Sequence, residues 1–169
     1  MTELLSIRPY LSTDREACLA VYDSNLPEYF AEGERAYFEA FLDYEIAAGA
    51  RYFVVETEAD TGTGRLSACG GFSLNEGCVY LRWGMVARHA QRQGLGKQLL
   101  AARLRLIEQN FVALYPGQAI RIHTSPLTKD FYLQHGFVVE KVVTEGLGPG
   151  LDQVCMVRPF AEVTSTATQ

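Results

Sequence analysis

A glycine-rich turn between a strand and the longest helix is the sequence feature that most constrains the fold. The segment Met85–Lys97 reads MVARHAQRQGLGK, with a strand-like stretch before it and a helical pattern from Gly94 onward. The first turn of a helix exposes unpaired backbone N–H groups and carries about half a positive charge. Glycines there let an anion approach the backbone closely. Arg92 and Lys97 add to this positive potential, so the turn predicts a cradle for an external anion.

The charge distribution supports this interpretation. The chain has a formal net charge of −5, which argues against a general nucleic-acid binder, because neutralising phosphates requires a basic surface. Residues 82–105 nevertheless contain six basic side chains and no acidic one, namely Arg82, Arg88, Arg92, Lys97, Arg103 and Arg105. This run fits an anion site, although a solvated helix face with a chance run of arginines is equally consistent. The acidic residues between 28 and 45 favour the exposed side of an amphipathic helix.

The composition is typical of one globular domain. The chain has 169 residues, of which 48% are hydrophobic, and lacks an apolar run long enough to span a membrane. The N-terminal residues lack the pattern of a signal peptide, so we expect a cytoplasmic protein. The four cysteines and three histidines are scattered, which favours reduced thiols and no metal site. We expect a domain over residues 1–160 and a short polar tail over 161–169.

Hydrophobic periodicity and turn residues predict an α/β fold with a mixed sheet. The element order is β-α-α-β-β-β-α-β-α-β-β. The predicted strands cover residues 4–9, 51–56, 65–74, 78–86, 119–123, 137–144 and 151–158, and the main helices cover 14–26, 33–49 and 94–111.

Two details of the helices can be tested directly. In the second helix, Tyr37, Phe41 and Tyr44 have the spacing of a buried stripe. A short helix after residue 123 is expected to begin with Ser125 as its N-cap and Pro126 as its first residue.

Two common nucleotide-binding motifs do not fit the glycine-rich turn. A P-loop requires Gly at position 91 and Ser or Thr at position 98, and both positions hold glutamine. A dinucleotide-binding G-x-G-x-x-G motif requires glycine at position 99, which is Leu99, and an acidic residue about 20 positions later, which is missing.

The motif that does fit is Q-x-x-G-x-G, formed by Gln91 to Gly96. It resembles the acyl-CoA-binding motif of the GNAT superfamily of N-acyltransferases, and the element order over nearly the whole chain is also similar to that fold. The resemblance implies splayed central strands, with the pyrophosphate held by the backbone from Arg92 to Lys97 and the pantetheine arm held by the end of the preceding strand. The implied acetyl-CoA-binding residues are Met85, Val86, Arg88, Gln91, Arg92, Gln93, Gly94, Leu95, Gly96, Lys97 and Ser125.

A tyrosine four residues before a Gly-Phe pair resembles the second signature of this family. Here it is Tyr132, followed by Gly136-Phe137. The resemblance implies that its phenol lies beside the sulfur of acetyl-CoA and protonates the departing thiolate. A packing aromatic with a hydrogen-bonded hydroxyl is the alternative. The sequence departs from the family upstream, where Ser125 and Thr128 replace a frequent Asn and a frequent Ala.

The general base and the acceptor are less well defined. Glu76 is the nearest candidate base, and a water relay is an equal alternative. In this family the two N-terminal helices line the acceptor pocket, so we expect Glu28 and Tyr29 to hold a cationic amine.

The resulting hypothesis is an N-acetyltransferase that moves an acetyl group from acetyl-CoA to a primary amine by direct attack through a tetrahedral intermediate. A small-molecule acceptor is favoured over a protein N-terminus or lysine. A non-catalytic CoA-binding regulatory module is the alternative, and the resemblance also allows a homodimer.

Overall fold

The computed structural model describes residues 6–115 and 118–160, so the predicted tail and the first two residues of the predicted 4–9 strand lie outside the described residues. The order of the elements is the one expected from the sequence. The strands are β1 (Ser6–Pro9), β2 (Arg51–Glu56), β3 (Ala68–Asn75), β4 (Cys78–Val86), β5 (Ala119–Thr124), β6 (Val138–Gly148) and β7 (Leu151–Pro159). The α-helices are α1 (Arg15–Ser24), α2 (Arg35–Ala40), α3 (Leu95–Phe111) and α4 (Lys129–Leu133).

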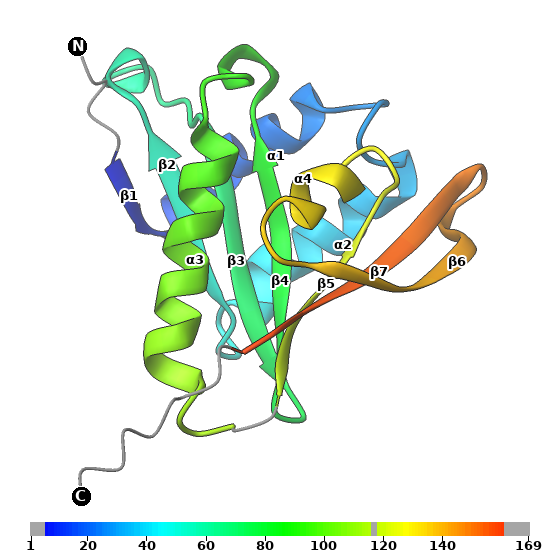
Figure 1. Cartoon of the computed structure of the whole chain (residues 1–169). Helices are drawn as coiled ribbons and strands as arrows, with labels where there is room; N and C mark the ends of the chain where they lie inside the picture. Colours follow the sequence, from blue (N-terminus) through cyan, green and yellow to red (C-terminus); the bar gives the residue numbers. More distant parts are fainter. Residues whose placement is uncertain (1–5, 116–117, 161–169) are drawn as a thin grey trace, which may run out of the picture.

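The strands form one mixed sheet in the order β1-β2-β3-β4-β5-β7-β6 (Figure 1). Neighbouring strands are antiparallel, apart from the parallel pair β4 and β5 at the centre. The long helix α3 connects these two strands, as a parallel connection requires. The predicted α/β class with a mixed sheet is therefore confirmed.

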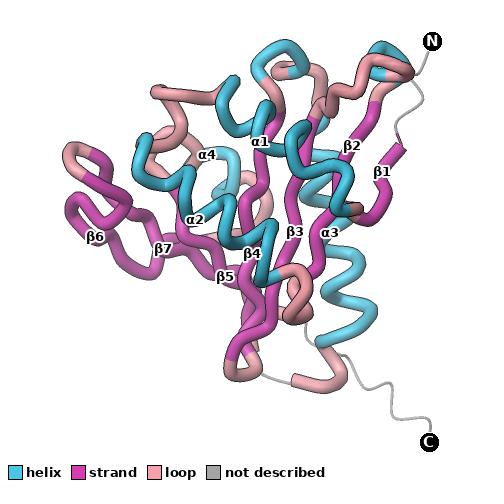
Figure 2. The backbone as a smooth tube through the Cα atoms, turned by 180° about the vertical axis from the view of Figure 1, so that it is seen from behind, coloured by secondary structure: helices cyan, strands magenta, loops and turns pink. Residues whose placement is uncertain are grey.

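Helices cover both faces of the sheet, with α1 and α2 in front in the view of Figure 2 and α3 on the opposite side. Successive side chains of β2 point to opposite faces of the sheet. Tyr52 and Val54 pack with α1 and α2, whereas Phe53 and Val55 pack in the clusters that contain α3 residues. This period of two is the expected pattern of a strand that is buried on both faces.

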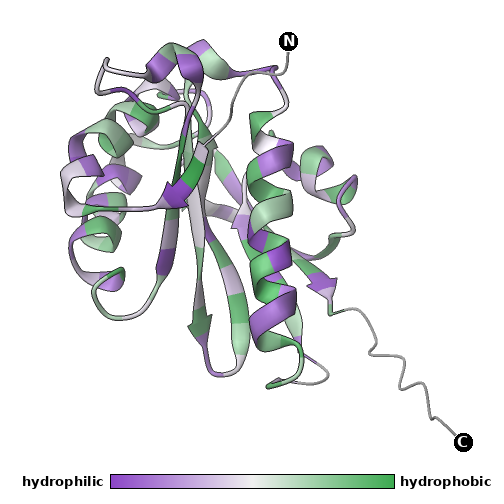
Figure 3. Ribbon diagram, turned by 90° about the vertical axis from the view of Figure 1, so that its left-hand side faces the viewer, coloured by the Kyte–Doolittle hydropathy of each residue, from purple (hydrophilic) through white to green (hydrophobic). Residues whose placement is uncertain are grey.

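The helix α3 matches the predicted 94–111 helix closely. Its stripe of Leu100, Leu104 and Ile107 is buried against the sheet, and hydrophobic and hydrophilic residues alternate along the helix (Figure 3). None of the helices in the described part of the chain has the length and apolar character that crossing a membrane requires.

The second helix differs from the prediction. It is regular only over α2 and continues as a π-helical turn, Phe41–Glu45. Tyr37 and Tyr44 are each 72% exposed, so the predicted stripe is wrong at both positions. Phe38, Phe41 and Leu42 are buried instead, at the spacing i, i+3, i+4. The spacing of the aromatic residues in the sequence therefore did not show which face of this segment packs against the sheet.

Other boundaries also differ. The predicted 137–144 strand continues to Gly148 as β6. The predicted 65–74 strand begins at Ala68, because the preceding residues form a loop around Asp60. The short helix α4 begins at Lys129 with Thr128 at its N-cap, so the assignment of Ser125 as N-cap is wrong. The residues from Pro126 to Thr128 form a turn, in which the Thr128 N–H donates to the Ser125 carbonyl at 3.2 Å.

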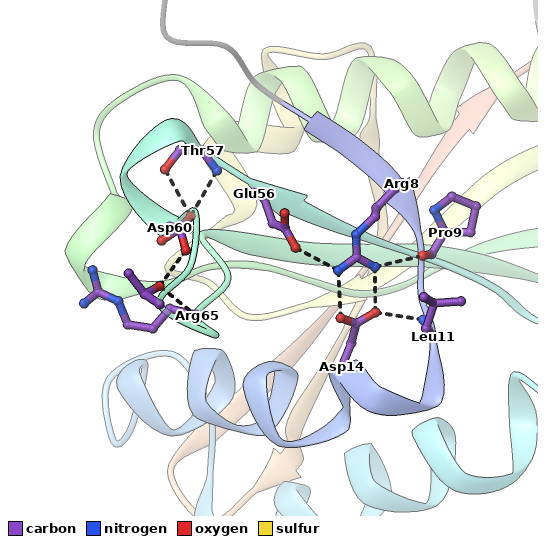
Figure 4. A network of polar contacts seen from close by, with 9 residues as sticks. Arg8, Pro9, Leu11, Asp14, Glu56, Thr57, Asp60 and Arg65 are labelled. Carbon is purple, nitrogen blue, oxygen red and sulfur yellow. Dashed lines mark hydrogen bonds and ion pairs between the residues drawn. The ribbon is translucent and has the colours of Figure 1, made fainter.

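An ion-pair cluster of Arg8, Asp14 and Glu56 joins β1, the start of α1 and β2 (Figure 4). Arg8 donates to both Asp14 carboxylate oxygens, at 2.7 and 2.8 Å, and to Glu56 at 2.8 Å. Asp14 also accepts the Leu11 N–H at 2.8 Å. This hydrogen bonding to Arg8 lowers the pKa of Asp14 below its usual value.

Candidate active site

The two central strands separate and leave an opening in the sheet. Only Val79 with Ile120 and Tyr80 with Arg121 are paired between β4 and β5, although β4 continues to Val86. A cavity of about 810 Å³ fills this opening. It is lined by β4, β5, the start of α3, α4 and the segment after α1. The predicted splay of the central strands is therefore confirmed.

A β-bulge lies in β4 where the cavity begins. The pairing with β3 shifts between Gly71 opposite Arg82 and Cys69 opposite Met85, which inserts one extra residue into β4. Trp83 within the bulge has a φ of 46°. The bulge moves Met85 to the face that packs against α1 and α2, whereas Leu81 packs on the α3 face. Bulges of this kind redirect side chains beside functional sites.

The glycine-rich turn has the geometry of an anion cradle. Gly94 adopts a left-handed φ of 79° at the N-cap of α3, and Arg92 has a φ of 64°. Among the described residues, no acceptor contacts the backbone N–H groups from Arg92 to Lys97. A Cβ at Gly96 would lie 3.6 Å from Val86 and 3.8 Å from Phe131, on the cavity wall. These N–H groups are available to a bound anion.

Gln91, the first residue of the motif, anchors the turn to the end of β4 and to the end of α1. Its Nε2 donates to Asn25 Oδ1 at 2.7 Å and to the Val86 carbonyl at 3.3 Å. Asn25, which is 2% exposed, donates to the same Val86 carbonyl at 3.0 Å. The carbonyl of Val86 is therefore already hydrogen-bonded within the protein, and Gln91 connects the cradle to the end of α1.

Two residues predicted to bind different ligands lie next to each other. Arg88, expected to meet phosphate, contacts Glu28, expected to hold an amine, at 3.2 Å. Arg88 also donates from Nε to the Ser24 carbonyl at 2.8 Å. Neither Arg88 nor Glu28 lines the cavity.

The other predicted residues divide into two groups. Met85, Val86, Gln91, Arg92, Gly96, Ser125, Tyr132 and Tyr29 line the cavity. Gln93, Gly94, Leu95 and Lys97 belong to the cradle but do not line the cavity; Leu95 is buried, and Gln93, Gly94 and Lys97 are exposed. Glu76, the candidate base, is exposed in the β3–β4 turn and lies outside the cavity lining.

Tyr132 lies on α4 and is 6% exposed. Its ring packs edge-on against Phe131 and Phe137, at centroid distances of 5.0 and 5.5 Å. Burial raises the pKa of Tyr132 above its usual value near 10, and the positive charge of the nearby Arg103 opposes this rise. The phenol therefore remains protonated at neutral pH, and it lines the cavity.

Another part of the cavity lining is acidic and aromatic. Glu34 is half-buried there, with Tyr29, Phe30 and Trp83 also in the lining. Burial raises the pKa of Glu34, although its Oε2 accepts the Ala31 N–H at 2.7 Å. A carboxylate beside aromatic rings is a suitable environment for an ammonium group.

The lining also contains residues that sequence reasoning did not assign to the site, among them Glu34, Arg103 and His123. Glu34 belongs to the acidic segment between residues 28 and 45, which was predicted to form the exposed side of a helix. Only the path of the chain in the structure shows that Glu34 lines the cavity and that Glu28 does not. Arg103 was part of the basic run. His123 is on β5, and burial lowers its pKa while its ring meets Tyr80 edge-on at 5.8 Å. The sequence separates these residues by up to 89 positions, so no local pattern connects them.

Residues 48–139, more than half of the chain, match the family model described as "Acetyltransferase (GNAT) domain". A search of curated proteins gave no match.

Solved structures with the same fold cover nearly the whole chain. The ribosomal-protein-S18-alanine N-acetyltransferase from Escherichia coli is 16% identical, with a TM-score of 0.71 over 98% of this chain and 100% of that chain. A structure described as a phosphinothricin N-acetyltransferase is 19% identical, with a TM-score of 0.73 over 94% and 100%. The yncA structure from Salmonella typhimurium, which contains its cofactor acetyl-CoA, is 19% identical, with a TM-score of 0.66 over 94% and 95%.

Proposed function

The chain belongs to the GNAT acetyltransferase family, and we propose that it transfers an acetyl group from acetyl-CoA to the primary amine of a small molecule. The amine attacks the thioester directly, and the reaction passes through a tetrahedral intermediate without an acyl-enzyme. The observation that carries the proposal is the cavity in the opening between β4 and β5, whose lining includes both residues of the cradle and Glu34.

The cradle fits the donor. Its N–H groups have no acceptor among the described residues, and the helix dipole of α3 adds positive potential for a pyrophosphate. Arg92 lines the cavity beside them and is exposed, so its guanidinium is available to phosphate oxygens. Among the described residues, β4 has no strand partner beyond Tyr80 on the β5 side, which leaves its edge open to the pantetheine arm.

Tyr132 is the proposed general acid. Collapse of the tetrahedral intermediate expels a thiolate, which requires a proton from a group that is still protonated at neutral pH. The phenol of Tyr132 meets this requirement, because burial keeps its pKa above the usual value. Phe131 and Phe137 hold the ring in place on both sides.

Glu34, rather than Glu28, is the proposed contact for the acceptor amine, and Tyr29 retains its predicted place in the same wall. A carboxylate whose pKa is raised by burial can both attract the ammonium form and accept its proton. Glu28 is paired with Arg88 and is 51% exposed at its side chain.

The β6–β7 hairpin favours a small acceptor. Leu147 of this hairpin lines the cavity, and a Cβ at the adjacent Gly148 would lie 3.6 Å from the Cβ of Ala31. The hairpin therefore meets the segment after α1 beside the acidic wall, which narrows the space for a folded protein acceptor. A protein N-terminus or lysine is the second candidate acceptor, since one structure with this fold acts on a ribosomal protein.

A ligand-binding and turnover experiment tests the proposal. The purified protein is melted with acetyl-CoA, CoA, NAD and ATP in parallel, and thiol release is then followed with a panel of amines. A ligand at about 100 times its Kd adds about 2.7 kcal/mol, which corresponds to a rise of roughly 5–10 °C in Tm for a chain of this size. We expect this rise with acetyl-CoA and CoA, and thiol release with small amines.

Three other results have distinct meanings. Binding of CoA without thiol release for any amine or peptide indicates a non-catalytic CoA-binding module. Thiol release only with peptides indicates a protein acceptor. A failure of both acetyl-CoA and CoA to shift Tm at millimolar concentration contradicts the proposal.

A further inference from the structure

Arg103 is a buried arginine that has no carboxylate within ion-pair distance among the residues that the structure describes. It lies in the middle of α3 and is 2% exposed. Its Nη1 donates to the Gly71 carbonyl at a long 3.3 Å. In the part of the chain that the structure describes, its Nε has no hydrogen-bond partner. A guanidinium has five N–H donors, and besides the bond to Gly71 this one interacts with the Tyr132 side chain, so it retains capacity for a further acceptor.

The sheet provides space for this side chain. A Cβ at Gly84 of β4 would lie only 2.7 Å from Nη2 of Arg103, and a Cβ at Gly70 of β3 would lie 3.3 Å from its Cζ. Any larger residue at Gly84 would have to displace the guanidinium. The glycine at the β4 bulge therefore accommodates Arg103 on the cavity wall next to Tyr132.

The other partly buried arginines of the described chain are neutralised. All six have carboxylate partners within 4.0 Å, namely Arg8, Arg15, Arg35, Arg82, Arg121 and Arg158. Glu34 is the acidic residue of the cavity lining, and its carboxylate is engaged with the Ala31 N–H. Leaving a charge buried and uncompensated is costly, because water no longer solvates it.

The phosphates of acetyl-CoA do not account for Arg103. At 1.5 Å per residue, its backbone lies about 9 Å along the helix axis from Lys97, where the cradle ends, and its guanidinium lies against Gly70 and Gly84 instead of at the turn. The guanidinium instead reaches the section of the cavity beside Tyr132 and the β4 bulge, where the acyl group and the acceptor meet in the proposed reaction.

We infer that Arg103 binds a carboxylate carried by one of the two substrates. This inference rests on the proposed function. The planar fork of a guanidinium matches a carboxylate with two parallel hydrogen bonds, and the buried position strengthens them. The carboxylate has two chemical sources, either the far end of a dicarboxylic acyl group on CoA or the acceptor itself, as in an α-amino acid.

Two binding arms distinguish these sources. In the first, titration calorimetry compares malonyl-CoA and succinyl-CoA with acetyl-CoA and butyryl-CoA, which have no terminal carboxylate. In the second, thermal melts with saturating CoA compare α-amino acids with their α-amides. We expect the carboxylate-bearing compounds to bind at least ten-fold more tightly in one arm.

Matched variants test whether the preference for a carboxylate depends on the Arg103 side chain. Arg103→Met removes the charge and retains a long apolar stem, whereas Arg105→Met does the same on the exposed side of the same helix. We expect Arg103→Met to reduce the preference to about two-fold or less, and Arg105→Met to leave it intact. Without ligand, Arg103→Met should raise Tm by about 2–4 °C, because an unpaired buried charge is removed.

The inference is overturned if neither arm shows a preference for a carboxylate in the wild-type protein, a result that does not depend on any variant folding. It is also overturned if Arg103→Met lowers Tm and keeps the preference, since the guanidinium is then structural. If acetyl-CoA binds and no carboxylate preference exists, only this inference fails. If no CoA thioester binds, the proposed function fails with it.

Discussion

Two arginines that contact the same sheet have opposite surroundings. Arg8 has two carboxylates within 2.8 Å and a further contact to the Pro9 carbonyl at 3.3 Å. Arg103, which is more deeply buried, has one long hydrogen bond to a backbone carbonyl. The charged groups of the ion-pair cluster have their partners within the protein, whereas the cavity contains polar groups, such as the Arg103 guanidinium, that can still accept a ligand as partner. This difference separates a part of the molecule that serves stability from a part that serves binding.

The comparison gives a general expectation for variants. Substitutions in the cavity should change turnover or ligand binding without lowering Tm, and substitutions in the ion-pair cluster should lower stability and leave turnover unchanged. A cavity variant that only destabilises the protein, or an ion-pair-cluster variant that only reduces turnover, would contradict the assignment of the cavity to binding and of the cluster to stability.

The largest effect is expected for Tyr132→Phe. Loss of the phenolic proton donor should reduce kcat by about 100-fold or more, which is the usual contribution of a general acid. The ring still packs between Phe131 and Phe137, so Tm should remain within about 1 °C. Steady-state kinetics by thiol release provides the measurement, with the exposed Tyr37→Phe as a matched control. Unchanged kcat in Tyr132→Phe would mean that the tyrosine is a packing aromatic.

The next effect concerns the cradle. In Gly96→Val, new methyl groups enter the space beside Val86 and Phe131, on the wall of the cavity. We expect acetyl-CoA to bind at least ten-fold more weakly, because the side chain occupies the path of the donor. Ala101→Val places the same change on the exposed side of α3 and should leave binding unchanged. Equal Kd values for both variants, measured by calorimetry, would place the donor elsewhere.

A smaller effect is expected at the acidic wall. Glu34→Gln retains the hydrogen bond to the Ala31 N–H but removes the charge, so the KM for the amine should rise about five- to ten-fold, the equivalent of about 1 kcal/mol. Glu28→Gln, outside the cavity lining, should change KM by less than two-fold. The opposite ranking of the two variants would restore Glu28 as the amine contact.

The smallest effect is expected in the ion-pair cluster. Asp14→Asn weakens its bond to Arg8 and should reduce the free energy of unfolding by about 1 kcal/mol at pH 7, with kcat unchanged. Because the pKa of Asp14 is lower in the folded protein than its usual 3.8, its stabilisation is present above that value and is lost as pH falls below it. Urea unfolding from pH 7 to pH 2.5 should therefore show the two proteins converging in stability below about pH 4. A constant difference at all pH values would contradict this assignment.

The sequence predicted the features that depend on local chain chemistry. The glycine-rich turn, the strand before it and α3 were placed nearly to the residue, because Gly94, the alternating strand pattern and the leucine stripe act over a few positions. The GNAT resemblance that these features suggested is confirmed by the family match.

The missed features depend on contacts between distant segments. The bulge at Trp83 reverses the side-chain alternation of β4, and the strand pattern gave no sign of it. Glu34 and Glu28 occur in the same acidic segment, and only the packing of that segment against the sheet decides which one faces the cavity. Arg103 had the appearance of any other basic residue until Gly70, Gly71 and Gly84 were seen beneath it.

Backbone hydrogen exchange in the cradle tests most directly whether acetyl-CoA binds there. The N–H groups from Arg92 to Lys97 have no acceptor among the described residues, so they should exchange rapidly in the free protein. Saturating acetyl-CoA should slow exchange in residues 92–97 and along the end of β4, and leave the loop around Asp60 unaffected. Unchanged exchange in residues 92–97 at an acetyl-CoA concentration that saturates binding would show that the donor does not occupy the cradle, and would contradict the proposed site.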